Sequence, residues 1–144
     1  MAISDSVNNL YVYGANAYTG YGNSLNNTIR GNSNDNYLYG YGGSDTLYGY
    51  GGDDYLNGGA GGDTMYGGTG NDSIDGGADA DLIFGEDGLD TLFANAGADT
   101  LYGGNDDDTI DGGAGNDLLN GDDGDDRIIG GDGNDTAFGG DGND

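Results

Sequence analysis

The residues with the clearest chemical potential in this sequence are aspartates that recur at a fixed interval. An Asp stands at every ninth position from residue 45 to the end, which gives Asp45, Asp54, Asp63, Asp72, Asp81, Asp90, Asp99, Asp108, Asp117, Asp126, Asp135 and Asp144. Carboxylates are hard oxygen donors, and Ca²⁺ prefers six to eight oxygen ligands. Because these carboxylates are all equivalent, the pattern indicates repeated cation binding and no single reaction centre.

The rest of the composition narrows the possible functions. Among 144 residues, 27 are acidic, two are Arg and none is His or Cys, so the formal net charge is -25. Such a charge repels nucleic acid and anionic membranes. Without His or Cys the chain lacks disulfides, the usual zinc and iron ligands, and thiol or imidazole catalysts, so we expect no enzyme. Apolar runs reach only four residues, so no membrane span and no N-terminal signal peptide are expected.

The elements that must position the aspartates repeat with the same period. Two residues after each Asp stands a large aliphatic residue, except at Ala137, and five residues before each Asp stands Gly, except at Ala94. The unit is G-G-x-G-x-D-x-U-x, where U is a large aliphatic residue, and its positions are numbered 1 to 9 here. Gly allows a sharp turn with positive φ, and a strand x-U-x points U inward and its neighbours outward. The unit therefore predicts an Asp-bearing loop followed by a short strand.

This unit resembles the RTX, or haemolysin-type calcium-binding, nonapeptide repeat. Residues 67–75 match that repeat at every defined position, and residues 40–144 follow it closely. The resemblance implies an all-β fold, a right-handed parallel β-roll (a β-solenoid) with two repeats per coil, in which the glycine loops bind calcium. It also implies that the two oxygens of one Asp serve successive ions. Loop carbonyls would complete the ligand shell, here those of Gly52, Gly61, Gly70, Gly88, Gly97, Gly115, Gly124 and Gly133.

The stacking of coils sets the expected number of ions. Parallel strands lie about 4.8 Å apart, so equivalent loops 18 residues apart come within reach of one shared ion. Pairing Asp45 with Asp63, and so on to Asp126 with Asp144, gives about 10 Ca²⁺ sites. That number of ions would change the net charge from -25 to about -5. Without metal we expect a disordered chain, so binding and folding are expected to be one event.

The repeat pattern divides the chain into three predicted parts. Residues 1–21 do not follow the repeat and are expected to form an atypical N-terminal cap. Residues 22–39 are expected to be calcium-poor repeats, because Asn27 and Asn36 take the Asp position and a neutral side chain attracts a dication weakly. Residues 40–144 are the expected calcium-binding β-roll, which ends within a repeat.

Two loops of the expected β-roll depart from the pattern at position 4. Asp79 and Asp106 replace Gly there, where a left-handed backbone is most easily adopted by Gly. The replacement predicts weaker calcium sites. Alternatively, Asp fits at little cost, since it adopts the left-handed conformation more readily than most residues.

One predicted sheet carries an outward column of aromatic residues. Position 9 of alternate repeats is Tyr48, Tyr66, Phe84 and Tyr102. Aromatic residues suit exposed strands, but a contiguous column can also form a docking face for a sugar polymer, a companion domain or another roll. Ice binding is not favoured, because Leu82 and Leu118 interrupt the neighbouring row of Thr residues.

The resemblance implies a calcium-binding module of a secreted bacterial protein. Related modules stay unfolded in the calcium-poor cytosol and fold outside the cell after type I secretion, which uses no N-terminal signal peptide. The module would stabilise or display a larger parent chain with attached domains, such as a protease, lipase or epimerase. The alternative functions are a structural or adhesive spacer array and the ligand-docking face described above.

Overall fold

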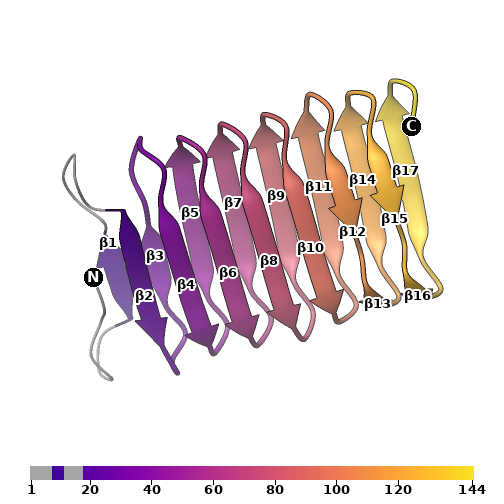
Figure 1. Ribbon diagram of the computed structural model, residues 1–144. Helices are drawn as coiled ribbons and strands as arrows, with labels where there is room; N and C mark the ends of the chain where they lie inside the picture. The colour runs from indigo at the N-terminus through magenta and orange to yellow at the C-terminus, as the bar shows by residue number, and fades with distance from the viewer. Residues whose placement is uncertain (1–7, 12–17) are drawn as a thin grey trace.

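The structure, a computed structural model, describes residues 8–11 and 18–144, and its regular elements are all β-strands (Figure 1). Sheet I has the order β1 (Asn9–Tyr11), β3 (Thr28–Arg30), β5 (Thr46–Gly51), β7 (Thr64–Thr69), β9 (Leu82–Asp87), β11 (Thr100–Asn105), β14 (Leu118–Asp123) and β17 (Thr136–Asp141). Sheet II has the order β2 (Thr19–Asn23), β4 (Tyr37–Gly42), β6 (Tyr55–Ala60), β8 (Ser73–Ala78), β10 (Thr91–Ala96), β12 (Thr109–Asp111) and β15 (Arg127–Ile129). Two short strands, β13 (Ala114–Gly115) and β16 (Asp132–Gly133), also belong to sheet II. The predicted cap over residues 1–21 lies largely outside the described residues.

Neighbouring strands within each sheet are parallel, and their paired residues are 18 positions apart, except that β1 pairs with β3 at a separation of 19. In β5 and β7, for example, Leu47 pairs with Met65. Backbone hydrogen bonds continue this pairing into the loops, since the N–H of Thr64 donates to the carbonyl of Asp45 at 2.9 Å. The chain alternates between the two sheets, so one coil contains two nonapeptides. The predicted all-β parallel β-roll is therefore confirmed.

One column of aliphatic side chains fills the space between the sheets. The position 8 residues are fully buried, with no exposed surface, at Ile29, Leu38, Leu47, Leu56, Met65, Ile74, Ile83, Leu92, Leu101, Ile110 and Leu119. The column weakens at the C-terminal end, where Ile128 is half-buried and Ala137 is exposed. Each repeat from Ile29 to Leu119 thus contributes one fully buried core residue, as the sequence predicts.

Left-handed backbone occurs at two positions of the repeat, 4 and 2, and the sequence predicts it only at position 4. At position 4, Asp79 and Asp106 have φ values of 73° and 78°, as expected where they replace Gly. Position 2 is also left-handed in every repeat from residue 41 to residue 140, and non-glycine residues adopt this conformation at Tyr41, Tyr50, Glu86, Asn95 and Asp122. Left-handed backbone costs an L-residue about 1–2 kcal/mol. The stacked coils therefore impose this loop shape even on bulky side chains.

The core column yields a test of the register. Replacing Leu92 by Ala removes a fully buried side chain and is expected to lower the free energy of unfolding by about 2–5 kcal/mol. Replacing its neighbour Phe93, which is 41% exposed, is expected to cost less than about 1 kcal/mol. Denaturant unfolding at a fixed calcium concentration measures both. A larger effect at Phe93 than at Leu92 would contradict the register.

Candidate metal centre

The predicted calcium-binding aspartates, which recur at every ninth residue from Asp45 to Asp144, lie inside the loops that join the two sheets. They are called the ladder below. Successive loops alternate between the two long edges of the roll (Figure 1), so one edge carries Asp45, Asp63, Asp81, Asp99, Asp117 and Asp135. The other edge carries Asp54, Asp72, Asp90, Asp108, Asp126 and Asp144. From Asp45 to Asp126 these side chains are only 1–6% exposed. Towards the C-terminal end Asp135 is half-buried and Asp144 is exposed, so the last two members of the ladder are less enclosed.

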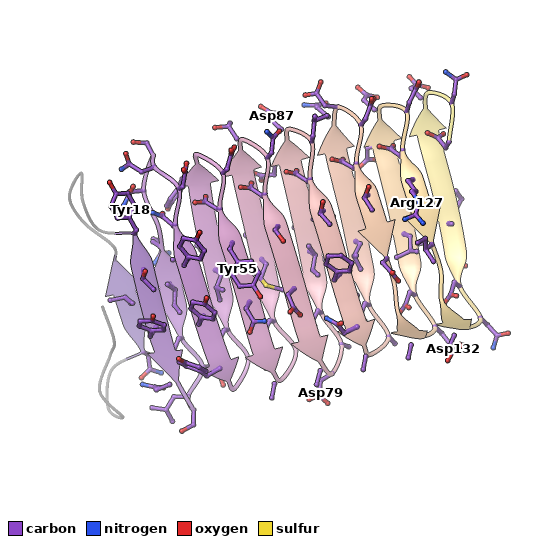
Figure 2. The ribbon with its side chains drawn as sticks, in the orientation of Figure 1. Tyr18, Tyr55, Asp79, Asp87, Arg127 and Asp132 are labelled. Carbon is purple, nitrogen blue, oxygen red and sulfur yellow. The ribbon has the colours of Figure 1, made fainter. Side chains whose placement is uncertain are left out.

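Acidic residues outside the ladder lie on the surface. Asp79, Asp87 and Asp132 project from the loop edges into solvent, as Figure 2 shows. Asp107 and Asp123 are exposed as well, whereas Asp75, Asp111 and Asp122 are half-buried. The structure therefore separates one enclosed carboxylate per repeat from a larger number of solvated ones.

One oxygen of each ladder carboxylate binds the preceding coil. The Oδ1 atom of Asp63 accepts a hydrogen bond from the N–H of Asp45 at 2.7 Å, and Oδ1 of Asp81 accepts one from Asp63 at 2.8 Å. The same bond is made to every member of the ladder, beginning with the N–H of Asn27. Each Asp side chain thus connects two coils.

The second oxygen of these carboxylates is buried and has no partner. This holds for the Oδ2 atoms of Asp45, Asp54, Asp63, Asp72, Asp81, Asp90, Asp99, Asp108, Asp117 and Asp126. A buried polar atom without a partner is costly, and the cost is larger when the group is charged. A regular series of bare, buried carboxylate oxygens is therefore a strong indication that a bound cation completes the structure.

Backbone carbonyls lie close to these bare oxygens. A Cβ atom added to Gly40, at position 1, would meet both Oδ2 of Asp45 and the carbonyl oxygen of Gly58 in the next coil. Gly49 stands in the same relation to Asp54 and Gly67. Position 1 carbonyls are thus candidate ligands that were not predicted. The signal for them in the sequence was the almost unbroken row of Gly at position 1.

The predicted position 4 carbonyls form a second column in the loops. A Cβ added to Gly70 would meet the carbonyl oxygen of Gly52, and one added to Gly133 would meet that of Gly115. The carbonyls of Gly70, Gly97 and Gly124 lie in the same way against position 4 of the next coil, at Gly88, Gly115 and Gly142. These carbonyls therefore run along the loop edges, and their binding of calcium stays a prediction.

The donor set as a whole fits a hard cation such as Ca²⁺. Within residues 8–11 and 18–144, no group of three or more acidic side chains converges on one point. Loop carbonyls would therefore have to supply most of the ligands around each Asp oxygen. An all-oxygen set of carboxylates and carbonyls is typical of calcium sites and offers nothing to a metal that prefers nitrogen or sulfur.

Burial also changes the proton affinity of the ladder. Desolvation raises the pKa of Asp72 from 3.8 to about 8, and that of Asp45 and of Asp81 to about 7. The hydrogen bond from the preceding coil lowers each value, and neighbouring ladder carboxylates raise it. A fully ionised ladder therefore requires positive charge from another source at neutral pH.

The loops that contain Asn27 and Asn36 differ from the Asp loops in the hydrogen bonding of the side-chain oxygen. The Oδ1 atoms of Asn27 and Asn36 each accept a hydrogen bond at 2.8 Å from the position 2 N–H of the same loop, at Asn23 and Asn32 respectively. Neither Asn23 nor Asn32 is left-handed, unlike position 2 of the Asp loops. The side-chain oxygen is thus satisfied within the loop, and no carboxylate oxygen is left bare.

Comparison with known proteins agrees with this geometry. A family model for the RTX calcium-binding nonapeptide repeat matches the chain in four copies, over residues 21–56, 57–92, 84–119 and 114–144. No curated protein matches the chain significantly. Among the described residues there is no helix long and apolar enough to cross a membrane. Because the four matches cover nearly all of the coils and the Asp loops, the chain belongs to the family of RTX calcium-binding nonapeptide-repeat proteins.

Proposed function

We propose that this chain is a module that folds by binding about 10 Ca²⁺ ions along the bare Oδ2 atoms of the ladder. The observation that carries the proposal is the series of ten buried, unpartnered Oδ2 atoms from Asp45 to Asp126. Position 1 and position 4 carbonyls of the stacked loops would complete each site. A bound Ca²⁺ supplies the positive charge that the enclosed carboxylates lack.

The cellular role follows from this dependence on calcium. With a net charge of -25 and one core residue per repeat, the chain gains too little from burial to fold against its own repulsion. It would stay unfolded in a calcium-poor cytosol and fold in extracellular calcium, which suits type I secretion. Once folded, the roll stabilises or displays the attached domains of a longer secreted protein.

The Asn-containing repeats over residues 22–39 have a separate role in this proposal. Their loop oxygens are satisfied by the N–H groups of Asn23 and Asn32 and not by a cation. Asn27 and Asn36 also donate their backbone N–H groups to Asp45 and Asp54. These coils therefore form a calcium-independent surface on which the first calcium-binding coils stack.

Removing one ladder carboxylate tests the assignment of the sites. The Asp81→Asn variant is expected to bind at least one ion fewer and to need several-fold more calcium for folding, because Asp81 is 4% exposed and its Oδ2 is bare. Asp79→Asn is the matched control, since Asp79 lies in the same loop and is exposed. Calcium titration followed by far-UV circular dichroism measures both. Equal effects in the two variants would contradict the assignment of Asp81 as a calcium ligand.

The raised pKa values predict how the calcium-free chain responds to pH. Folding raises the pKa of Asp72 to about 8 and that of Asp81 to about 7, from 3.8 in the unfolded chain. Such groups stabilise the fold fully below pH 3.8, and this contribution is lost as pH rises through about 7 to 8. In EDTA we therefore expect more β-structure at pH 4 than at pH 8. Stability that increases with pH in EDTA would contradict the assignment.

A second candidate function concerns the aromatic column of sheet I. The rings of Tyr48, Tyr66, Phe84 and Tyr102 are parallel within 6°, and successive centroids are 5.0, 5.0 and 5.1 Å apart, so the predicted column is confirmed. Arg30 lies over the ring of Tyr48 at one end of the column, with its guanidinium carbon 5.0 Å from the ring centroid. The column therefore already accommodates one cationic group from the chain itself.

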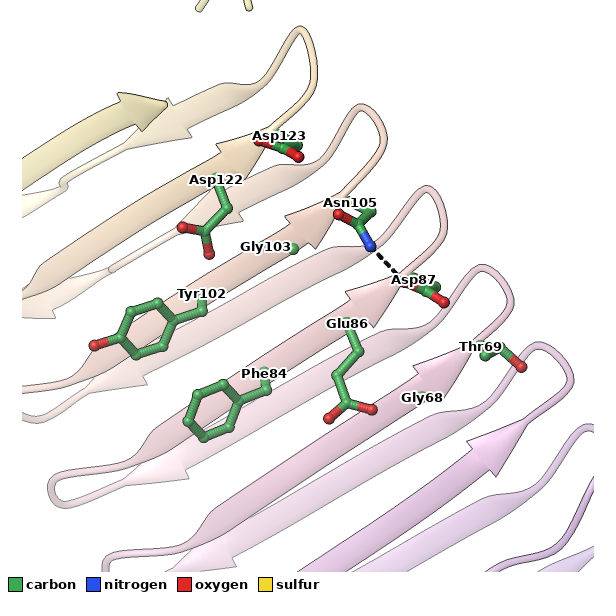
Figure 3. A pocket seen from close by; sticks show the side chains of 11 residues that line it. Gly68, Thr69, Phe84, Glu86, Asp87, Tyr102, Gly103, Asn105, Asp122 and Asp123 are labelled. Carbon is green, nitrogen blue, oxygen red and sulfur yellow. Dashed lines mark hydrogen bonds between the residues drawn. The ribbon is translucent and has the colours of Figure 1, made fainter. Parts of the chain in front are cut away.

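Two carboxylates flank a hollow beside this column. Position 2 of neighbouring strands reads Glu86, Gly104 and Asp122, so the glycine leaves a gap between two acidic side chains. Phe84 and Tyr102 form the adjoining wall of this hollow (Figure 3). Aromatic rings next to carboxylates suit a lysine or arginine side chain. We propose that the hollow docks a basic segment of a companion domain.

A peptide titration tests this docking face. In saturating calcium, a short arginine-containing peptide is expected to bind at least ten times more weakly to the Glu86→Gln/Asp122→Asn variant than to the wild type. The control is Asp111→Asn/Asp132→Asn, which removes the same charge from sheet II. If the control weakens peptide binding equally, attraction to the overall charge explains it and the docking face is wrong.

A further inference from the structure

Ala94 interrupts the row of glycines at position 1. This position is Gly in every other repeat from Gly40 to Gly139. The missing side chain matters, because a Cβ on Gly85 would meet Oδ2 of Asp90, and one on Gly103 would meet Oδ2 of Asp108. The position 1 glycines thus leave the space that the bare ladder oxygen of the same loop occupies. Ala94 carries a methyl group at this position and is fully buried.

The carboxylate of the same loop, Asp99, lies closer to position 4 than its counterparts do. A Cβ added to Gly97, at position 4, would lie 2.5 Å from Oδ1 of Asp99. At Gly115 the equivalent distance to Oδ1 of Asp117 is longer, 2.9 Å, and at Gly70 and Gly88 none of the nearest atoms is from the ladder. The Asp99 side chain therefore lies closer to position 4, which is the direction expected if the methyl group of Ala94 takes part of its usual space.

At position 4 the backbone of this loop is not unusual. Gly97 is not left-handed there, and neither are Gly115 and Gly142, whose loops have Gly at position 1. The carbonyl oxygen of Ala94 would lie 2.9 Å from a Cβ on Gly76, whereas the other position 1 carbonyls lie at 2.7 Å or closer to the equivalent point. The position 1 carbonyl is thus slightly displaced at the loop of Asp99, whereas the position 4 carbonyl of Gly97 lies as its counterparts do.

We propose that the loop formed by residues 94–99 interrupts the calcium ladder, and that Asp99 Oδ2 binds no ion at calcium concentrations that fill the other sites. The inference rests on the proposed calcium-binding function. Calcium needs six to eight oxygens at about 2.3–2.6 Å, so a methyl group in the space of the carboxylate, together with the shift of the Ala94 carbonyl, removes ligands from one shell. The opposite edge has Gly at position 1 throughout, from Gly49 to Gly139, and its ladder is continuous.

The interruption divides one edge of the roll into two calcium-bound runs. The first contains Asp45, Asp63 and Asp81, and the second begins at Asp117. Repeat proteins are stabilised mainly by contacts between neighbouring repeats, so a gap in one edge weakens the coupling between the coils on either side. The continuous edge, which includes Asp90 and Asp108 beside the gap, holds the two parts together.

Counting bound ions tests this inference directly. Equilibrium dialysis against calcium, followed by elemental analysis, is expected to find one more ion per chain in Ala94→Gly than in the wild type. Ala96→Gly is the matched control, because Ala96 lies in the same loop and its side chain is exposed. It is expected to bind the wild-type number. The reverse change, Gly103→Ala on the continuous edge, is expected to remove one ion, with folding verified by circular dichroism.

The outcomes separate this inference from the proposed function. Equal numbers of ions in the wild type and Ala94→Gly would overturn the interruption while leaving the calcium-binding function intact. A gain of one ion in Ala96→Gly as well would also overturn it, because the effect would then not depend on position 1. If no variant binds calcium, the proposed function itself is wrong, and the inference with it.

Discussion

The whole structure depends on the enclosure of one carboxylate per nonapeptide. Two rows of like charges lie inside the loops, where water cannot screen them, and each row places a carboxylate in every coil. The core opposes this repulsion with only one aliphatic side chain per repeat, such as Leu47 or Ile83. Burial of so narrow a column opposes this repulsion only weakly, which is why we propose that a cation balances the ladder.

The two oxygens of each ladder Asp have different roles in the roll. Oδ1 accepts a backbone hydrogen bond from the preceding coil and fixes the stacking, as between Asp63 and Asp45. Oδ2 remains bare and faces the loop carbonyls, where a cation can bind. Asn27 shows why an amide cannot replace the carboxylate, since its single oxygen is used within its own loop. Coil stacking and the proposed calcium dependence thus involve the same side chain.

Much of this arrangement could be predicted from the sequence because each coil is in register with the next. A strict nine-residue period places Asp72, Ile74 and Tyr66 on the loop, core and outward rows without further information. The left-handed backbone at position 2 could not be predicted in this way, because Tyr41 and Glu86 are residues that normally avoid it. The sequence therefore also did not predict where the position 2 side chains lie. In sheet II, for example, the ring of Tyr41 stacks on those of Tyr21 and Tyr39. At position 2 the backbone conformation that the residue type favours differs from the one that the stacked coils require, and the residues adopt the conformation that the coils require.

The central claim is that calcium, and not the protein chain alone, stabilises the β-roll at neutral pH. The most direct test is far-UV circular dichroism of the chain in EDTA, titrated with Ca²⁺ and in parallel with Mg²⁺. We predict a disordered spectrum in EDTA that becomes β-rich cooperatively with Ca²⁺ and not with Mg²⁺, because Mg²⁺ demands a small octahedral site and gives up its water reluctantly. A β-rich spectrum already present in EDTA would contradict the claim and show that the aliphatic column and the hydrogen-bonded ladders suffice.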